Sequence, residues 1–422
     1  MPNLNRELWF ATSIILIFVA AWGQPCIFSF WDRLWNPAQL TRRTGAEDSG
    51  LDWRLFGVDA FVLLDACAPY YSDQKNPGAP YRELMTRNRA HQKPVPGEER
   101  VLQLMRRALN PRSLKTAALG FRVAIGDDAA IWQPGPGYQT VLTCDWFLQG
   151  THFLSDRHPP DAVGWKCLAR AVSDLAAMGA QPRCFLLSLA LPTSRTGAWL
   201  KEFLSGLRAA SQKLRCHAVG GDTTRRDDVL INITVVGECR RGRAVLRSGA
   251  QPGDAIFVSG RLGEAEYGRQ LLRAASRHPN ARDTRLRKHL YPEPRLAVGA
   301  WLAKNRLATA MMDLSDGLSS DLAKLCEASR VGASINKLAL PHVNIEEERA
   351  IKFDATDLAL HGGDDYELLF TVAKKNVTRI PKALGRVALT PIGEITSQQR
   401  VVLVDQRGAS RLIQDKGWDP FR

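Results

Sequence analysis

The pattern of hydrophobic and polar residues changes near residue 97, and beyond it helical and extended segments alternate. Three segments carry apolar residues at helical spacing: 100–109, 161–180 and 198–214. Strand-like segments lie between and after them: 138–148, 183–191, 217–225 (a strand end and loop) and 230–239. This alternation predicts an α/β fold. In the second helix, Asp161 is the expected N-cap and Gly179 the expected C-terminal residue.

A second unit begins near residue 251. Pro252, Gly253 and Asp254 form a predicted turn that leads into a new apolar strand. After it we expect helices over residues 308–329 and then a closing series of strands and helices. The predicted domains are therefore residues 96–250 and 251–422, with residues 1–95 as a separate extension.

The extension has a different character from the rest of the chain. Residues 8–22 are an apolar run that follows Arg6 and Glu7, and the next charged residue is Asp32. A membrane span needs about 20 apolar residues, so a short anchor over residues 8–31 and a signal-peptide core both fit poorly. We favour a third interpretation, in which translation starts near Met85 and the leading segment is an artefact of the gene model. A membrane tether is the next alternative.

Composition and charge narrow the class of protein. The 422 residues are 45% hydrophobic and 24% charged, as in a soluble globular protein. The formal net charge of +14 favours anionic partners such as nucleotides, phosphorylated metabolites, nucleic acid or anionic lipid. The eight cysteines include no C-x-x-C pair, so we expect reduced thiols, no zinc site and a cytoplasmic protein.

Aspartates recur where apolar segments meet Gly, Ser or Thr. They are Asp127 and Asp128 in "VAIGDDAAIW", Asp145, Asp174, Asp222, Asp313 and Asp316. Each one alone is explained as a turn or cap residue, except Asp174, which lies in a small, apolar helical stretch where a lone charge is costly. Together they suit Mg²⁺, which prefers carboxylate oxygens and completes its shell with water and phosphate.

The sequence contains few other features that could bind phosphate. The sequence has no G-x-x-x-x-G-K-[ST] motif, no kinase glycine loop and no nucleophile elbow. Arg247 in "RSGAQPGD" lies among small residues, where its guanidinium group can bind phosphate oxygens in a bidentate manner. The neighbouring arginines at 240, 241 and 243 are better explained as a solvated basic hairpin.

Eight motifs occur in the order found in one enzyme family: "IGDDAA", "THFLSD", "SDLAAMGA", "GGDTT", "RSGAQPGD", "DLSDGLSSDL", "HGGDDYELLF" and "GWDPF". From about Gly97 to Phe421 the chain resembles the thiamine-monophosphate kinases, of the aminoimidazole ribonucleotide synthetase and selenophosphate synthetase superfamily. The resemblance implies an α/β (α+β) fold of two domains like that synthetase. The first would be a mixed sheet with helices that forms a homodimer, and the second an α/β sandwich.

The resemblance also implies a reaction and a site. The reaction is ATP-dependent phosphorylation of thiamine monophosphate to thiamine diphosphate with several Mg²⁺ ions and with no covalent or general-base residue. The implied metal ligands are Asp128, Thr143, Cys144, Asp145, Asp174, Asp222, Asp313 and Asp316. The implied ATP contacts are Gly221, Asp222, Arg247 and Ser315. The implied contacts with thiamine monophosphate are His152, Asp364 and Trp418. No nucleic acid partner is expected.

Three residues depart from the family pattern. Cys144 stands where the family has Thr, and a neutral thiol is a poor Mg²⁺ ligand, so only its backbone carbonyl could serve. Asp364 replaces a common Glu, and Trp418 replaces Tyr or Phe. One alternative is another kinase or synthetase of the superfamily. The other is an inactive or regulatory nucleotide-binding module, which the unusual Cys144 at a metal-ligand position would explain.

Overall fold

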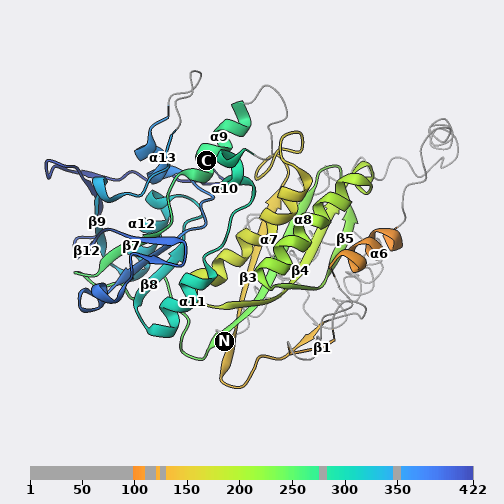
Figure 1. Cartoon of the computed structure of the whole chain (residues 1–422), viewed down its shortest axis with the longest axis horizontal. Helices are drawn as coiled ribbons and strands as arrows, with labels where there is room; N and C mark the ends of the chain where they lie inside the picture. Colours follow the sequence, from red (N-terminus) through yellow and green to blue (C-terminus); the bar gives the residue numbers. More distant parts are fainter. Residues whose placement is uncertain (1–97, 110–119, 124–129, 275–282, 346–352, 422) are drawn as a thin grey trace, which may run out of the picture. The chain divides into compact units, whose positions relative to one another are not determined.

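The computed structural model describes residues 98–109, 120–123, 130–274, 283–345 and 353–421 (Figure 1). The extension 1–95, with its apolar segment 8–31, lies outside the described residues, as do Asp127 and Asp128. In the described part of the chain, no helix is both long enough and apolar enough to cross a membrane.

The first sheet is mixed, as predicted. Its strands are β3 (Tyr138–Leu148), β4 (Gln181–Leu191), β5 (His217–Arg225) and β6 (Leu230–Arg240), in the order β3-β6-β4-β5. The pairs β3–β6 and β6–β4 are antiparallel, and β4–β5 is parallel. Segment 217–225 is strand throughout rather than a strand end and loop. A short antiparallel pair, β1 (Phe121–Val123) and β2 (Ile131–Trp132), precedes the sheet.

Among the described residues, helices cover one face of this sheet (Figure 1). They are α6 (Glu98–Leu109), α7 (Pro160–Ala177) and α8 (Ala198–Leu214). Phe185 and Leu187 of β4 and Ile233 of β6 are buried beneath them. On the opposite face, Leu142 and Trp146 of β3 are 67% and 56% exposed. The sheet therefore has one core face and a second face that exposes apolar side chains at β3, while Ala130 and Trp132 cover this second face at Cys184 and Val219.

Helix α7 begins one residue earlier than predicted. Pro160 occupies its first turn and Pro159 its N-cap position, so the expected cap by Asp161 is wrong. The Asp161 carboxylate instead accepts a hydrogen bond from the Tyr291 hydroxyl at 2.8 Å. At the other end, Gly179 has a φ of +66°, the left-handed conformation that glycine adopts after a helix.

The second sheet has the strand order β14-β13-β9-β12-β7-β10-β8, and β11 pairs with β12. Its strands are β7 (Ala255–Ser259), β8 (Ala308–Asp313), β9 (Gly332–Asn336), β10 (Leu368–Val372), β11 (Ala383–Leu384), β12 (Val387–Thr396), β13 (Val401–Val404) and β14 (Ser410–Leu412). All pairs are antiparallel except β13–β9. Strand β8 corrects our expectation of helix over 308–329, because helix begins only at Leu318.

The described helices of the second half are α9 (Glu264–Ala274), α10 (Arg287–Leu290), α11 (Leu296–Asn305), α12 (Leu318–Ser329) and α13 (Ala355–His361). Short 3-10 turns lie at Thr193–Arg195, Thr284–Leu286, Lys337–Ala339 and Lys374–Arg379. The end of α7 packs into this half, since Ala176 shares a core with Val298, Phe257 and Phe370. The domain boundary that we expect near residue 250 falls in the connection between the two sheets and stays a prediction.

Candidate active site

Helix α7 carries a charged stripe into the protein interior. Lys166, Arg170 and Asp174 are spaced four residues apart, so they lie on one face of the helix. The side chain of Lys166 is 1% exposed and that of Arg170 is 15% exposed. Sequence reasoning identified Asp174 but missed the two cations. Their four-residue spacing from Asp174 within an apolar helix could have indicated that they share its face.

Three aspartates form one anionic cluster, of which Asp313 is buried and the other two are partly buried. The Asp145 charge on β3 contributes to the raised pKa values of Asp174 on α7 and of Asp313 at the end of β8. Burial, and then the neighbouring Asp174 carboxylate, raise the pKa of Asp313 to about 8. Burial also raises the pKa of Asp174, although the Thr143 hydroxyl donates a hydrogen bond to it. The cluster therefore carries more negative charge than its surroundings compensate.

The donor chemistry of this cluster fits a divalent cation. Carboxylate oxygens are the ligands that Mg²⁺ prefers, and burial, which raises the pKa values of Asp174 and Asp313, makes a nearby cation favourable. The fully buried Ser173 hydroxyl, next to Asp174, faces Asp313 and lowers its pKa against the larger effect of burial. No group of three acidic, histidine or cysteine side chains in the described part encloses a metal ion by itself. Water and substrate phosphate would have to supply the other ligands.

Arg170 connects the carboxylate cluster to a second group of polar residues. Its Nε donates to the Asp145 Oδ2 at 3.3 Å, and its guanidinium group lies 5.6 Å from the centre of the Phe147 ring. His152 is adjacent, with its ring 5.7 Å from that of Phe147. Burial and the Arg170 charge lower the pKa of His152 to about 4, so His152 is neutral near pH 7.

Asp364 lies at the other end of the α7 stripe. Its Oδ2 accepts a hydrogen bond from the Lys166 Nζ at 2.7 Å, and its Oδ1 accepts one from the Tyr366 hydroxyl at 2.7 Å. Burial opposes ionisation, but the charges of Lys166 and Arg170 hold the pKa of Asp364 well below its usual range. Its side chain stays 30% exposed. Asp364 is therefore an ionised carboxylate at the surface of a buried network.

The loop after β8 and the loop before β10 lie side by side, because β8 and β10 are antiparallel neighbours. The Asp364 N–H donates to the Ser315 carbonyl at 2.8 Å. In the first loop, the Asp321 carboxylate accepts from the N–H groups of Ser315, Asp316 and Gly317. Asp316 pairs with Lys324 at 2.5 Å and is not placed with Asp174. Asp321, which fixes this loop, was not predicted from the sequence.

The other residues predicted to contact ATP or substrate lie outside the carboxylate cluster. The Trp418 N–H donates to the Asp316 carbonyl at 2.9 Å, which brings the half-exposed indole to the same loop. Arg247 is exposed, but its charge lowers the pKa of Asp174, so it lies near the cluster. Asp222 is exposed on β5, and its carboxylate accepts a hydrogen bond from the Thr223 N–H at 2.9 Å.

The backbone before Asp222 is tightly packed. Gly221 has a φ of +149°, and a Cβ added there would lie 1.9 Å from the Leu187 carbonyl oxygen. Only glycine fits this position without a shift of the backbone. The buried Thr223 hydroxyl, one residue beyond Asp222, has no hydrogen-bond partner among the described residues. This strand end therefore offers an unsatisfied donor next to an exposed carboxylate.

Cys144 lies on the opposite face of β3 from the carboxylate cluster. Thr143 and Asp145 point toward α7, whereas Cys144 is exposed and its thiol lies 3.4 Å from the Asn232 Oδ1. Residues alternate between the two faces of a strand, so the thiol cannot join the cluster. A contribution of Cys144 to metal binding is limited to its carbonyl. Cys in place of the family's Thr at position 144 therefore removes no side-chain ligand from the carboxylate cluster.

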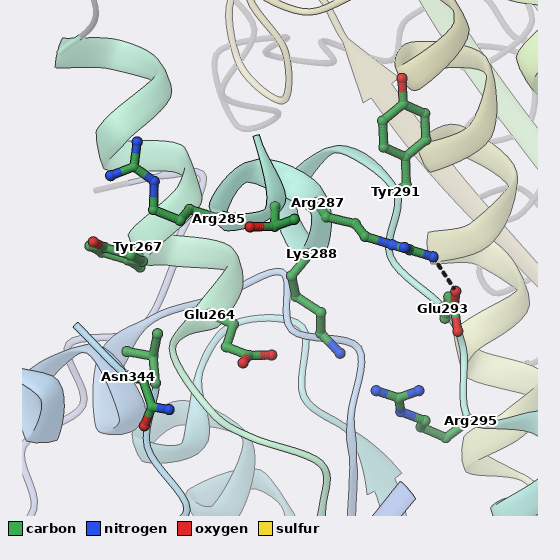
Figure 2. A pocket seen from close by; sticks show the side chains of 11 residues that line it. Glu264, Tyr267, Arg285, Arg287, Lys288, Tyr291, Glu293, Arg295 and Asn344 are labelled. Atoms are coloured by element: carbon green, nitrogen blue, oxygen red, sulfur yellow. Dashed lines mark hydrogen bonds and ion pairs between the residues drawn. The ribbon is translucent and has the colours of Figure 1, made fainter. Parts of the chain in front are cut away.

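A separate cavity of about 400 Å³ lies beside α9 and α10 (Figure 2). Lys288 and Arg295 point into the same part of it, and Arg287 pairs with Glu293 at 3.4 Å (Figure 2). Beneath them, Glu367 is fully buried and accepts hydrogen bonds from Arg295, Lys288 and the Ser259 hydroxyl. The sequence did not predict this cavity. Its Lys288 and Arg295 side chains bind Glu367, which lies three residues after Asp364 in the chain.

Comparison with known proteins relates the chain to one family. Residues 126–239 match the family model described as AIR synthase related protein, N-terminal domain, and residues 251–406 match the C-terminal domain of the same family. A thiamine-monophosphate kinase of Synechococcus elongatus is 36% identical over 303 residues, which are 70% of this chain and 91% of the relative. One of Bacillus subtilis is 33% identical over 325 residues, 75% of this chain and 98% of the relative.

Solved structures agree with the sequence relatives. The AaThiL structure complexed with AMPPCP and TMP has a TM-score of 0.60 at 32% identity, and the match covers 72% of this chain and 94% of that one. Both halves of the fold are thus the two AIR synthase related domains that the resemblance implied. With relatives above 30% identity that are matched over nine tenths of their length, the chain belongs to the thiamine-monophosphate kinase family.

Proposed function

We propose that this protein transfers the terminal phosphoryl group of ATP to thiamine monophosphate, which gives ADP and thiamine diphosphate. The observation that carries the proposal is the α7 stripe, which joins the Asp145, Asp174 and Asp313 cluster to Asp364 through Arg170 and Lys166. One end suits a polyphosphate with its metal ions, and the other suits the acceptor. The family relatives support the same reaction.

The chemistry needs no general base. A phosphate oxygen of thiamine monophosphate, already anionic near pH 7, forms a bond to the γ-phosphorus of ATP. The bond from that phosphorus to the β–γ bridging oxygen breaks, and its electron pair leaves with ADP. The residues of this chain bring two polyanions together and align them, because Arg170 and Arg247 add positive charge beside the carboxylate cluster. His152, neutral at this pH, repels neither reactant.

We propose that the site binds several Mg²⁺ ions. The residues that would hold them are Asp128, Thr143, the Cys144 carbonyl, Asp145, Asp174, Asp222, Asp313 and Asp316. Bound Mg²⁺ would neutralise phosphate charge and stabilise negative charge that develops during transfer. We assign ATP to Gly221, Asp222, Arg247 and Ser315, where the unpartnered Thr223 hydroxyl adds a hydrogen-bond donor. We assign thiamine monophosphate to His152, Asp364 and Trp418.

We also propose that the protein is a homodimer. The open face of the first sheet carries Leu142, Trp146 and Leu186, which are 67%, 56% and 38% exposed. An exposed apolar patch of this kind is typical of an interaction surface. A second copy of the chain is the simplest partner, because one face that pairs with itself closes a two-fold dimer.

We place the protein in the cytoplasm. All six described cysteines are free thiols, and five of them are buried, which suits a reducing compartment. A membrane tether over residues 8–31 would instead put the protein in the membrane fraction. N-terminal mass analysis of the native protein determines whether translation begins near Met85.

Release of ADP tests the reaction. The full chain with ATP and Mg²⁺ should release ADP when thiamine monophosphate is added and should form an equal amount of thiamine diphosphate. Other phosphate acceptors serve as controls. Release with another acceptor alone would identify a different enzyme of the superfamily, and no release with any acceptor would identify an inactive nucleotide-binding module.

A further inference from the structure

A buried lysine supports the carboxylate that we assign to the substrate. Lys166 is 1% exposed, and its Nζ lies 2.7 Å from the Asp364 Oδ2, whereas the Asp364 side chain is 30% exposed. An ammonium group is costly to bury without a partner, so the pair is a fixed part of the interior. Asp364 therefore has one oxygen bound from within the protein and part of its surface facing solvent.

The position of Lys166 is fixed in turn by two histidines. Its Nζ lies 3.2 Å from the His289 Nδ1, and the His289 Nε2 lies 3.1 Å from the His158 Nε2. Because an ammonium group can only donate, His289 accepts at Nδ1 and donates from Nε2 to His158. The His158 Nδ1 lies 3.1 Å from the Leu154 amide nitrogen and 3.3 Å from the Leu154 carbonyl oxygen, so this backbone fixes the ring. Burial, followed by the Lys166 charge, lowers the pKa of His158 to about 4, which agrees with a neutral ring.

The backbone at the other end of the chain of hydrogen bonds is also constrained. Asp364 and Tyr366 have φ values of +67° and +50°, which non-glycine residues rarely adopt. The Tyr366 hydroxyl binds the second oxygen of Asp364 at 2.7 Å. Unusual backbone conformations persist where the surrounding contacts enforce them, and they concentrate at functional sites. Both carboxylate oxygens are thus directed by the protein.

We propose that Lys166 is a positioning residue for substrate binding: through its ion pair it holds the Asp364 carboxylate in the orientation that receives thiamine monophosphate. The pair of His289 and His158 holds Lys166 in place. Lys166 lies on α7 of the first half, and Asp364 precedes β10 of the second, so their ion pair aligns residues from both halves of the fold. This inference rests on the proposed function, since it concerns the same substrate.

The test is a double-mutant cycle with Lys166→Met and Asp364→Asn in the full chain. Lys166→Met should raise the KM for thiamine monophosphate about 10- to 100-fold, change the KM for ATP by less than about twofold and lower kcat much less. In the Asp364→Asn background the same substitution should change the KM by less than about threefold, because the carboxylate that Lys166 directs is gone. Lys304→Met, at an exposed position of α11, is the matched control and should have no effect.

Several results would overturn the inference. An unchanged KM for thiamine monophosphate in folded Lys166→Met does so, and so does an equal effect of that substitution in both backgrounds, which would show a purely structural lysine. Should Lys166→Met not fold, His158→Asn is decisive, because it loosens Lys166 and should raise the same KM at least threefold; no change contradicts the inference. Wild-type protein without activity on thiamine monophosphate would refute the proposed function instead.

Discussion

Acidic residues of the candidate site differ in how their charge is compensated. Asp364 has the Lys166 ammonium at 2.7 Å, and Glu367 is bound by Lys288 and Arg295. Asp313 has no such cation among the ion pairs of the described residues, and burial with the Asp174 charge raises its pKa to about 8. Asp313 is among the carboxylates that we assign to Mg²⁺, whereas the paired Asp364 and Glu367 support substrate binding and structure.

Asp174→Asn should therefore abolish activity without unfolding the protein. The amide removes one negative charge from an overcharged cluster and keeps the size of the side chain, so the fold should be at least as stable. Turnover should fall by about two orders of magnitude or more because the cation loses a ligand. Steady-state ADP release and thermal unfolding measure the two effects. Near-normal turnover in this variant would contradict the metal cluster.

Asp365 is predicted to make stability depend on pH. Its carboxylate accepts N–H groups of Gly263 and Ala265 at 2.6 and 3.0 Å, and burial raises its pKa to about 7. The folded protein thus keeps this proton up to about pH 7, whereas the unfolded chain loses it near pH 4. Between these values the folded state binds more protons, so stability falls as pH rises.

Asp365→Asn should remove this dependence. Relative to wild type, the free energy of unfolding of the variant should increase from pH 4 to pH 7, by up to about 4 kcal/mol, and stay level above pH 7. Chemical denaturation of both proteins at several pH values gives the difference. A difference that is constant over this range would show that Asp365 is ionised in the folded protein at pH 5.

Single residues also mark the limits of prediction from sequence. Asp174 could be identified from the sequence because a carboxylate in an apolar helix is costly to bury without a partner. The same argument was not applied to Lys166 and Arg170 in that helix. Long basic side chains are usual on solvated helix faces, so their burial becomes visible only when the partner segments are in place. Asp145 lies 25 residues before its partner Arg170, and Asp364 lies 198 residues after its partner Lys166.

At the scale of elements, local patterns predicted the helices and strands of the first half well. The predicted helix 198–214 and strand 138–148 coincide with α8 and β3. Segment 308–313 was wrongly expected to be helical, because a short apolar run does not distinguish a buried strand from a helix. Its pairing with β10, more than fifty residues later, decides the outcome. Contacts between distant segments were the missing information.

Close packing of α7 on α8 gives a prediction at this scale. A Cβ at Gly206 would lie 1.9 Å from the Asp161 carbonyl oxygen, and one at Gly164 would lie 2.0 Å from the Phe203 carbonyl oxygen. Gly206→Ala should force the helices apart and lower stability by about 1–3 kcal/mol. Activity should fall as well, since α7 carries the charged stripe.

Denaturant unfolding and ADP release together test this packing. Ser205→Ala is the control, because residue 205 is exposed on the same helix and the change adds no atoms. It should leave both quantities within experimental error of wild type. A Gly206→Ala protein that matches wild type in stability would show that the helices separate without cost.

At the scale of the whole molecule, the open face of the first sheet predicts association. The wild-type chain of 46.8 kDa should sediment at twice that mass at micromolar concentration. Replacement of Leu142 and Trp146 by Lys places like charges opposite each other across a two-fold interface and should give monomers. Leu412→Lys, at a residue 65% exposed on β14 of the second sheet, should remain dimeric. A monomeric wild type would refute the dimer.

The two faces of β3 serve different purposes within one short strand. Thr143 and Asp145 face the charged stripe of α7, and Leu142, Cys144 and Trp146 face outward between them. A deletion of one residue in this strand would shift every later side chain to the opposite face. Substitutions can alter one face and spare the other, but a change in length would damage both at once. We therefore expect related proteins to differ in the residues of this strand but to keep its length.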